Sequence, residues 1–224
     1  MSSASYHPSL TERGERVRVW APTTPSPPAT WHDPDAVACF VPNGPAPSEI
    51  NGLALNPATP PQDAAGWARL VASPDRQPPL ATSALHRGRG AGAVILEPDG
   101  RVWLIEPTNH FAGYRCTFPK GSMERGYELA ALAAKEAFEE TGLLVEIGAF
   151  LLDTPRPGSM ARYYLARRIG GVPTAMGWES QAVLLAPRHR LRGLLNRLVD
   201  HPVVAALEAA EGWTVRPALG KMGA

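Results

Sequence analysis

Three glutamates in the second half of the chain have a spacing that can bring their carboxylates together. Glu136, Glu139 and Glu140 stand at positions i, i+3 and i+4, which share one side of an α-helix. Carboxylates this close repel one another, and hard cations such as Mg²⁺ or Mn²⁺ relieve that repulsion by binding carboxylate oxygens. The spacing therefore favours a metal site, although glutamate clusters on helices also occur as solvated faces.

The helix that would carry these glutamates is predicted over residues 128–141. Its other side holds small residues suited to packing against a sheet, and Gly142 suits a left-handed position at the helix C-terminus. Before it, the apolar runs 91–96 and 101–105 are joined by a Pro-Asp-Gly turn, which is a hairpin pattern.

Further strands are predicted over residues 143–152, 162–168 and 182–185. A helical pattern follows over residues 191–210, and we expect Pro202 to interrupt it, because proline disrupts helix interiors. Mixed strands with two main helical segments indicate an α+β sandwich.

The first third of the chain is rich in proline: 15 of the 24 prolines lie in the first 88 residues, which excludes a helical bundle there. Strand patterns at residues 16–20 and 36–41, together with tryptophan and phenylalanine, distinguish it from a solvated linker. We therefore expect a Pro-rich N-terminal extension or small β-rich domain at residues 1–87, packed on a main domain at residues 88–224. The connector is expected at residues 73–79.

The segment FPKGSMERGYELAALAAKEAFEETGLL resembles the box of the Nudix hydrolase family, written G-x5-E-x7-R-E-U-x-E-E-x-G-U with U a bulky apolar residue. The matching positions are Gly121, Glu136, Glu139, Glu140, Gly142 and Leu143. The resemblance extends over about residues 88–212. It implies an α/β/α sandwich with a mixed sheet.

Three box positions depart from the pattern. Tyr127 stands where the box has its first glutamate, Lys135 replaces the arginine, and Ala137 replaces the bulky apolar residue. In the family the first glutamate and the arginine brace the loop against the helix. Here Tyr127 and Lys135 could pack or hydrogen-bond instead, or Glu128 could take the glutamate's role.

The resemblance also implies roles for individual residues. Glu136 and Glu140 would be the main metal ligands, with the Gly121 carbonyl as a further ligand and Glu139 as an assisting ligand or base. Glu179, in a later loop, would be a catalytic carboxylate or metal ligand, or else a solvent-exposed residue. Lys120, Arg115 and Arg162 are candidates for binding substrate phosphates, and the candidates for stacking on a base are Phe111, Tyr163, Tyr164 and Trp178.

Composition limits the partners and the location. The net charge of +1 gives no sign of a surface for extended nucleic acid, and no apolar run approaches the length of a membrane span. Two distant cysteines without a ligand spacing favour a reducing, cytoplasmic location. A homodimer formed through the extension is a further hypothesis.

The expected function is Mg²⁺-dependent hydrolysis of a phosphoanhydride in a nucleoside diphosphate linked to another group, or in a similar polyphosphorylated small molecule. The Pro-Lys-Gly start of the box is similar to that of family members acting on diadenosine polyphosphates, diphosphoinositol polyphosphates and capped RNA. We place the first two substrates ahead of ADP-ribose. The alternative is a catalytically weak or inactive module that binds a nucleotide or a protein partner.

Overall fold

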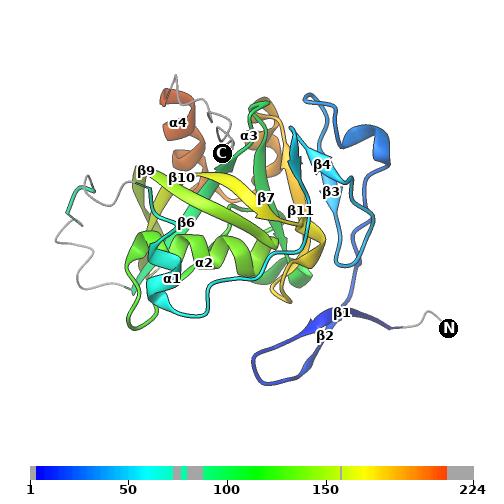
Figure 1. The fold of residues 1–224 in the computed structure, drawn as a ribbon, viewed down its shortest axis with the longest axis horizontal. Helices are drawn as coiled ribbons and strands as arrows, with labels where there is room; N and C mark the ends of the chain where they lie inside the picture. Colours follow the sequence, from blue (N-terminus) through cyan, green and yellow to red (C-terminus); the bar gives the residue numbers. More distant parts are fainter. Residues whose placement is uncertain (1–3, 73–76, 80–87, 157, 211–224) are drawn as a thin grey trace, which may run out of the picture.

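The computed structural model describes residues 4–72, 77–79, 88–156 and 158–210, which are built around one mixed sheet (Figure 1). The strands of this sheet are β3 (Ala38–Phe40), β6 (Gly88–Leu96), β7 (Val102–Pro107), β8 (Lys120–Ser122), β9 (Leu143–Arg156), β10 (Ser159–Gly171) and β11 (Ser180–Ala186). Their order is β3-β11-β7-β6-β10-β9, and β8 pairs with β6 outside this order. β6 and β10 are parallel, and the other neighbours are antiparallel.

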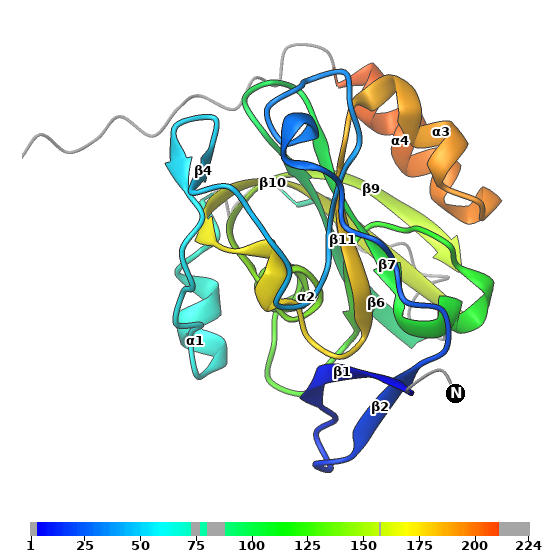
Figure 2. The ribbon, with the colours of Figure 1, turned by 90° about the vertical axis from the view of Figure 1, so that its right-hand side faces the viewer.

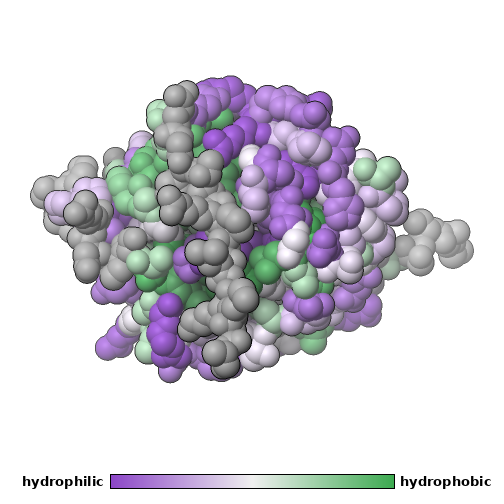
Figure 3. Space-filling view, turned by 45° about the horizontal axis from the view of Figure 1, so that its top comes forward, coloured by the Kyte–Doolittle hydropathy of each residue, from purple (hydrophilic) through white to green (hydrophobic). Residues whose placement is uncertain are grey.

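Helices cover both faces of this sheet (Figure 2). α2 (Leu129–Thr141) lies on one face, and α3 (Leu191–Leu194) and α4 (His201–Ala209) lie on the other. Alternate residues of β6 divide between two cores, with Ala93 and Ile95 packed toward α2 and Val94 and Leu96 toward α3 and α4. Figure 3 shows hydrophilic residues over much of the upper right of the molecule and hydrophobic residues grouped toward the left. The α/β/α sandwich with a mixed sheet is confirmed.

The predicted hairpin and central helix are also confirmed. β6 and β7 are joined by a turn in which Gly100 has φ +87° and the Glu97 N–H donates to the Arg101 carbonyl at 2.9 Å. α2 ends at Gly142, whose φ of +70° is the left-handed conformation expected from the sequence. β9 and β10 are longer than predicted because they pair with each other along most of their length.

The C-terminal helical segment differs from its prediction. The chain leaves the helix after α3, passes through a short 3₁₀ turn at Leu198–Asp200, and begins α4 at His201. Pro202 thus lies in the first turn of α4, where its missing N–H has no helical partner to lose. Within the described residues, every helix is too short or too polar to cross a membrane.

The proline-rich N-terminal part contains short elements and contributes to the main sheet. The predicted strands at 16–20 and 36–41 correspond to β2 (Arg16–Val19) and β3, whereas β1 (Ser5–Leu10) was missed because Pro8 argues against a strand. β3 pairs with β11 at the sheet edge, and its Phe40 ring centre lies 5.6 Å from that of Trp103.

The remaining elements are β4 (Glu49–Ile50), β5 (Leu53–Ala54), α1 (Ala64–Ala68) and 3₁₀ turns at Pro28–Thr30, Thr108–Gly113, Pro173–Ala175 and Arg188–Arg190. Of the expected connector, residues 73–76 lie outside the described part of the chain.

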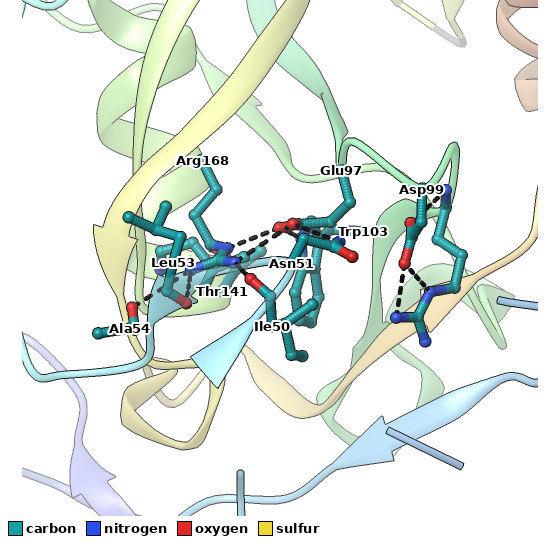
Figure 4. A network of polar contacts seen from close by, with 11 residues as sticks. Ile50, Asn51, Leu53, Ala54, Glu97, Asp99, Trp103, Thr141 and Arg168 are labelled. Atoms are coloured by element: carbon teal, nitrogen blue, oxygen red, sulfur yellow. Dashed lines mark hydrogen bonds and ion pairs between the residues drawn. The ribbon is translucent and has the colours of Figure 1, made fainter. Parts of the chain in front are cut away.

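A buried ion pair ties the β4–β5 segment to the main sheet (Figure 4). The Arg168 guanidinium donates to Glu97 at 2.6 Å and 3.2 Å, and both side chains are almost completely buried. The remaining guanidinium bonds reach the carbonyls of Ile50, Leu53 and Ala54 at 2.9 to 3.3 Å. A buried charge requires such partners, so the N-terminal segment satisfies a cation of the main sheet.

Candidate active site

Helix α2 positions Glu136, Glu139 and Glu140. Its small residues Ala130, Ala134 and Ala137 are buried against the sheet, which allows a close approach of helix and strands. Glu136 and Glu140 lie beneath the neighbouring strand with only 7% and 6% of their surface exposed. Glu139, one residue earlier than Glu140, is exposed.

Strand β8 lies against these buried carboxylates. The Lys120 backbone N–H donates to Glu140 at 2.6 Å, a charge-assisted bond that fixes the carboxylate. Gly121 lies directly against the Glu136 carboxylate, and a Cβ at this position would overlap with it. A side chain at position 121 would therefore displace the Glu136 carboxylate from its present position.

Burial changes the acidity of both inner glutamates. Burial, followed by repulsion from Glu139, raises the pKa of Glu136 from 4.5 to about 8. Burial also raises the pKa of Glu140 to about 8, with the Glu136 carboxylate adding to the effect and Lys120 opposing it. In the absence of a cation, these carboxyls therefore retain protons at a pH where ordinary glutamates have lost them.

Glu124, rather than Tyr127 or Glu128, pairs with the lysine that replaces the box arginine. The Lys135 ammonium donates to Glu124 at 2.7 Å and to Glu139 at 2.6 Å, and it lies 6.0 Å from the centre of the Tyr127 ring. Although burial opposes the charge, the hydrogen bonds with these two carboxylates raise the pKa of Lys135. The chain thus keeps an acid–base brace, but its acid stands three residues before the expected position.

Glu124 was not a candidate in the sequence, yet it belongs to the carboxylate group of the site. Ligand oxygens of Glu124, Glu136 and Glu139 all lie within 4.8 Å of one another. Glu140 stands beside this group on the same helix. Glu124 could not be identified from helical spacing, because it precedes the helix, which begins at Leu129.

The loop that carries Glu179 is attached to the same helix. The Gly177 N–H donates to the Glu139 carbonyl at 2.7 Å, and the Glu179 carbonyl accepts from the Thr108 N–H at 2.8 Å. Partial burial, then repulsion from Glu12 and Glu139, raises the pKa of Glu179. Glu179 is therefore close enough to the helix carboxylates to sense their charge.

A cavity of about 470 Å³ opens on the other side of the Lys120–Gly121 segment. Four basic residues line it, namely Arg89, Lys120, Arg156 and Arg197, and no acidic residue of the described chain does so. Tyr114 lies between two of these cations, with Lys120 Nζ 5.0 Å and Arg197 Cζ 5.4 Å from its ring centre. The cavity suits an anionic group next to the carboxylates.

Arg156 is the buried cation of this cavity. Its guanidinium pairs with Asp200 at 2.7 Å and donates to the Tyr114 hydroxyl at 3.2 Å. Its Nε is buried and has no hydrogen-bond partner among the described residues. An unsatisfied buried donor is costly, so this position favours an acceptor from outside the chain.

The two other arginines expected to bind phosphate lie elsewhere. Arg162 is buried, and two of its nitrogens donate to Asp153 at 2.7 Å. Because this internal carboxylate already holds the guanidinium, the structure does not support the expected binding of phosphate by Arg162. Arg115 is exposed and is not among the residues that line the cavity. Three cavity arginines were missed, because they come from segments far apart in the sequence.

Comparison with known proteins adds a family to this geometry. A model of the NUDIX domain matches residues 86–197. RNA pyrophosphohydrolases from two strains of Caulobacter vibrioides are 40% identical over 52 residues, which is 23% of this chain. The chain spans only 30% of the length of these curated relatives.

Solved structures similar to this chain include a NUDIX hydrolase from Nitrosomonas europaea, which is 24% identical and has a TM-score of 0.48. The match covers 56% of this chain and 72% of that chain. A C. elegans Ap4A hydrolase has 17% identity, 55% and 96% coverage and a TM-score of 0.45. An ADP-ribose pyrophosphatase from Streptococcus suis has 18% identity, 57% and 96% coverage and a TM-score of 0.45. Since the NUDIX model matches half of the chain and the helix glutamates of its box lie together beside a basic cavity, this protein belongs to the Nudix family.

Proposed function

We propose that this protein is a divalent-metal-dependent pyrophosphohydrolase that cleaves a phosphoanhydride in a nucleoside diphosphate linked to another group, or in a similar polyphosphorylated small molecule. The observation that carries the proposal is where Lys120 and Gly121 lie: they separate a group of negatively charged carboxylates from a positively charged cavity. Buried carboxylates lie on one side of this segment and a cavity with four basic residues lies on the other. A polyphosphate needs both, since it binds cations of the protein and metal ions at once.

The residues fit a hard divalent cation. Their donors are carboxylate oxygens, grouped within 4.8 Å for Glu124, Glu136 and Glu139, which is the chemistry that Mg²⁺ and Mn²⁺ select. The raised pKa of Glu136 reflects burial and a neighbouring negative charge, and a cation offsets both. We assign Glu136, Glu139, Glu140 and the Gly121 carbonyl to the metal, as the family resemblance implies, and add Glu124. Bound there, the metal would supply charge neutralisation and a water of lowered pKa.

The protein's own residues then bind and orient the substrate and move a proton. Lys120, Arg89 and Arg197 place cationic nitrogens around the phosphate oxygens, and the unpartnered Arg156 Nε supplies a further donor. Glu139 and Glu179 are exposed carboxylates whose charges act on the buried Glu136, and we assign the proton of the attacking water to one of them. Because Glu139 Oε2 accepts from Lys135, the accepting atom on that residue would be Oε1.

The substrate class rests on this charge and on the Pro-Lys-Gly start of the box. A cavity with several cations and one aromatic ring favours a compound with several phosphates, such as a diadenosine polyphosphate or a diphosphoinositol polyphosphate, ahead of ADP-ribose. An RNA pyrophosphohydrolase is among the relatives by name, so a 5′-polyphosphate end is a further candidate. A cytoplasmic location and a homodimer stay predictions from the sequence.

The test is phosphate release from a panel of these compounds with Mg²⁺, comparing the wild type with Glu140→Gln. We expect the substitution to reduce turnover at least about 100-fold, because it removes a carboxylate from the metal and proton-transfer chemistry. Glu208→Gln, an exposed carboxylate on α4 paired with Arg192, is the matched control and should keep wild-type turnover. Equal turnover by wild type and Glu140→Gln would contradict the proposal.

A binding module without turnover is the second candidate, and the Lys135 ammonium favours it. This cation already lies between Glu124 and Glu139 and can neutralise them without a metal. The same panel distinguishes the two candidates. If neither wild type nor Glu140→Gln releases phosphate while a compound of the panel still raises the melting temperature, the binding module is correct.

A further inference from the structure

The β1–β2 hairpin presents aromatic rings and arginines on one exposed face. Tyr6 and Arg18 are directly opposite in the register, so their side chains point to the same side. The Arg16 guanidinium lies 3.9 Å from the Tyr6 ring centre, and the Arg18 guanidinium lies 4.1 Å from that of Trp20. Trp20 is 68% exposed and Tyr6 is 40% exposed. The hairpin therefore offers flat, cationic stacking surfaces to the solvent.

The opposite face of the hairpin is anchored to the body of the protein. Val19 is buried, and the Trp20 N–H donates to the Asn109 side chain at 2.9 Å. The Asn109 amide in turn donates to the Arg18 carbonyl at 2.8 Å. At its tip, Glu12 accepts from the Trp178 indole N–H at 2.9 Å, next to Glu179. The hairpin projects from the body in Figure 1, yet its exposed face is held in place by these bonds.

Residues 108–113 connect this face with the basic cavity. Asn109, His110 and Ala112 all have positive φ, a conformation that non-glycine residues rarely adopt. Within this loop Phe111 is 78% exposed, while Ala112 lines the cavity. The loop is therefore held in an unfavourable conformation. The exposed Phe111 stands in the chain between Asn109, which bonds to the hairpin, and Ala112, which lines the cavity.

We propose that the exposed face of the hairpin (Tyr6, Arg16, Arg18 and Trp20) together with Phe111 binds the bases of a single-stranded nucleic acid whose 5′-polyphosphate end occupies the basic cavity. Aromatic rings and stacked guanidinium groups recognise nucleobases from their flat faces, which a single strand exposes and a duplex conceals. This proposal rests on the proposed function, because it extends the substrate of the same site from a small molecule to the end of a strand.

The net charge of +1, from which we expected no extended nucleic acid, is an average over the whole surface. It does not describe local groups of cations, such as Arg16 and Arg18 on the hairpin or Arg89, Lys120 and Arg197 at the cavity. A few phosphates and bases near the end of a strand would be sufficient to contact such local groups. An acidic peptide would pair with the arginines but would not use the flat stacking surface that they form with the rings.

The experiment measures binding of fluorescent oligonucleotides to the full-length protein carrying Glu140→Gln, which prevents turnover. Ribo- and deoxyribo-oligonucleotides with a 5′-triphosphate are compared with a nucleoside triphosphate and with a duplex. We expect the single strands to bind more tightly than the nucleoside triphosphate, and Trp20→Ala and Phe111→Ala each to weaken single-strand binding roughly 10-fold. Leu198→Ala, which removes an equally exposed apolar side chain on the α3–α4 side, is the matched control and should bind as the parent does.

The proposal is overturned if affinity does not increase with strand length, if duplex binds as well as single strand, or if anionic vesicles bind in place of oligonucleotides. It is equally overturned if Trp20→Ala and Phe111→Ala bind the strand as tightly as Leu198→Ala. These outcomes can be distinguished from a failure of the proposed function. If the wild type releases no phosphate with Mg²⁺, hydrolysis is refuted, whatever affinity for oligonucleotides is measured.

Discussion

The buried pair Glu136 and Glu140 should make the metal-free protein less stable as pH rises. Burial raises the pKa of each carboxyl from 4.5 to about 8, so the folded protein binds more protons than the unfolded chain between these values. When the folded state binds more protons, the free energy of unfolding decreases with increasing pH. The stability is complete below the unfolded pKa of 4.5 and is lost as pH passes toward about 8.

The size of the effect follows from the pKa shifts. One pKa unit corresponds to about 1.4 kcal/mol, so a shift from 4.5 to about 8 sets an upper limit of roughly 5 kcal/mol for one group. We expect a loss of at least about 2 kcal/mol between pH 5 and pH 8.5, which corresponds to a decrease in melting temperature of roughly 4–8 °C. Saturating Mg²⁺ should remove most of this decrease, since it stabilises the ionised carboxylates.

The assay is thermal and urea unfolding of the metal-free protein across this pH range, with and without Mg²⁺. Glu136→Gln and Glu140→Gln should each reduce the pH dependence, because glutamine does not titrate. Glu208→Gln should leave the dependence as in the wild type, since that carboxylate is on the surface of α4. Stability that increases from pH 5 to pH 8.5 in wild type relative to Glu140→Gln would refute the reasoning.

Three further substitutions test single features. Gly121→Ala should abolish turnover and lower the melting temperature, because the added Cβ overlaps the Glu136 carboxylate; a variant with wild-type activity would contradict this. Arg168→Met should cost about 3–5 kcal/mol by urea unfolding, since it leaves Glu97 buried without its cation, and adding Glu97→Gln should restore part of that loss. Lys135→Met should lower metal-free stability but increase the gain in melting temperature with Mg²⁺, because the lysine competes with the metal for two carboxylates; an unchanged Mg²⁺ gain would count against this competition.

The features that the sequence determined are those set by neighbours along the chain. The hairpin between β6 and β7 follows from two apolar runs and an Asp-Gly turn, and α2 follows from its small-residue side and the glycine at position 142. The same local spacing placed Glu136, Glu139 and Glu140 on one helix and identified the Nudix box. Helical period and turn geometry act over a few residues, so a single sequence is sufficient to show them.

The features that only the tertiary structure decided depend on contacts between distant segments. Arg89, Arg156 and Arg197 line one cavity although each comes from a different part of the chain, and no local pattern separates them from the buried Arg162. The pairing of β3 with β11 is equally non-local, because any exposed strand edge of suitable pattern could accept it. The sequence therefore determined the three glutamates of the helix, whereas folding decided that Glu124 joins them and which cations line the nearby cavity, since these contacts result from the packing of the whole sheet.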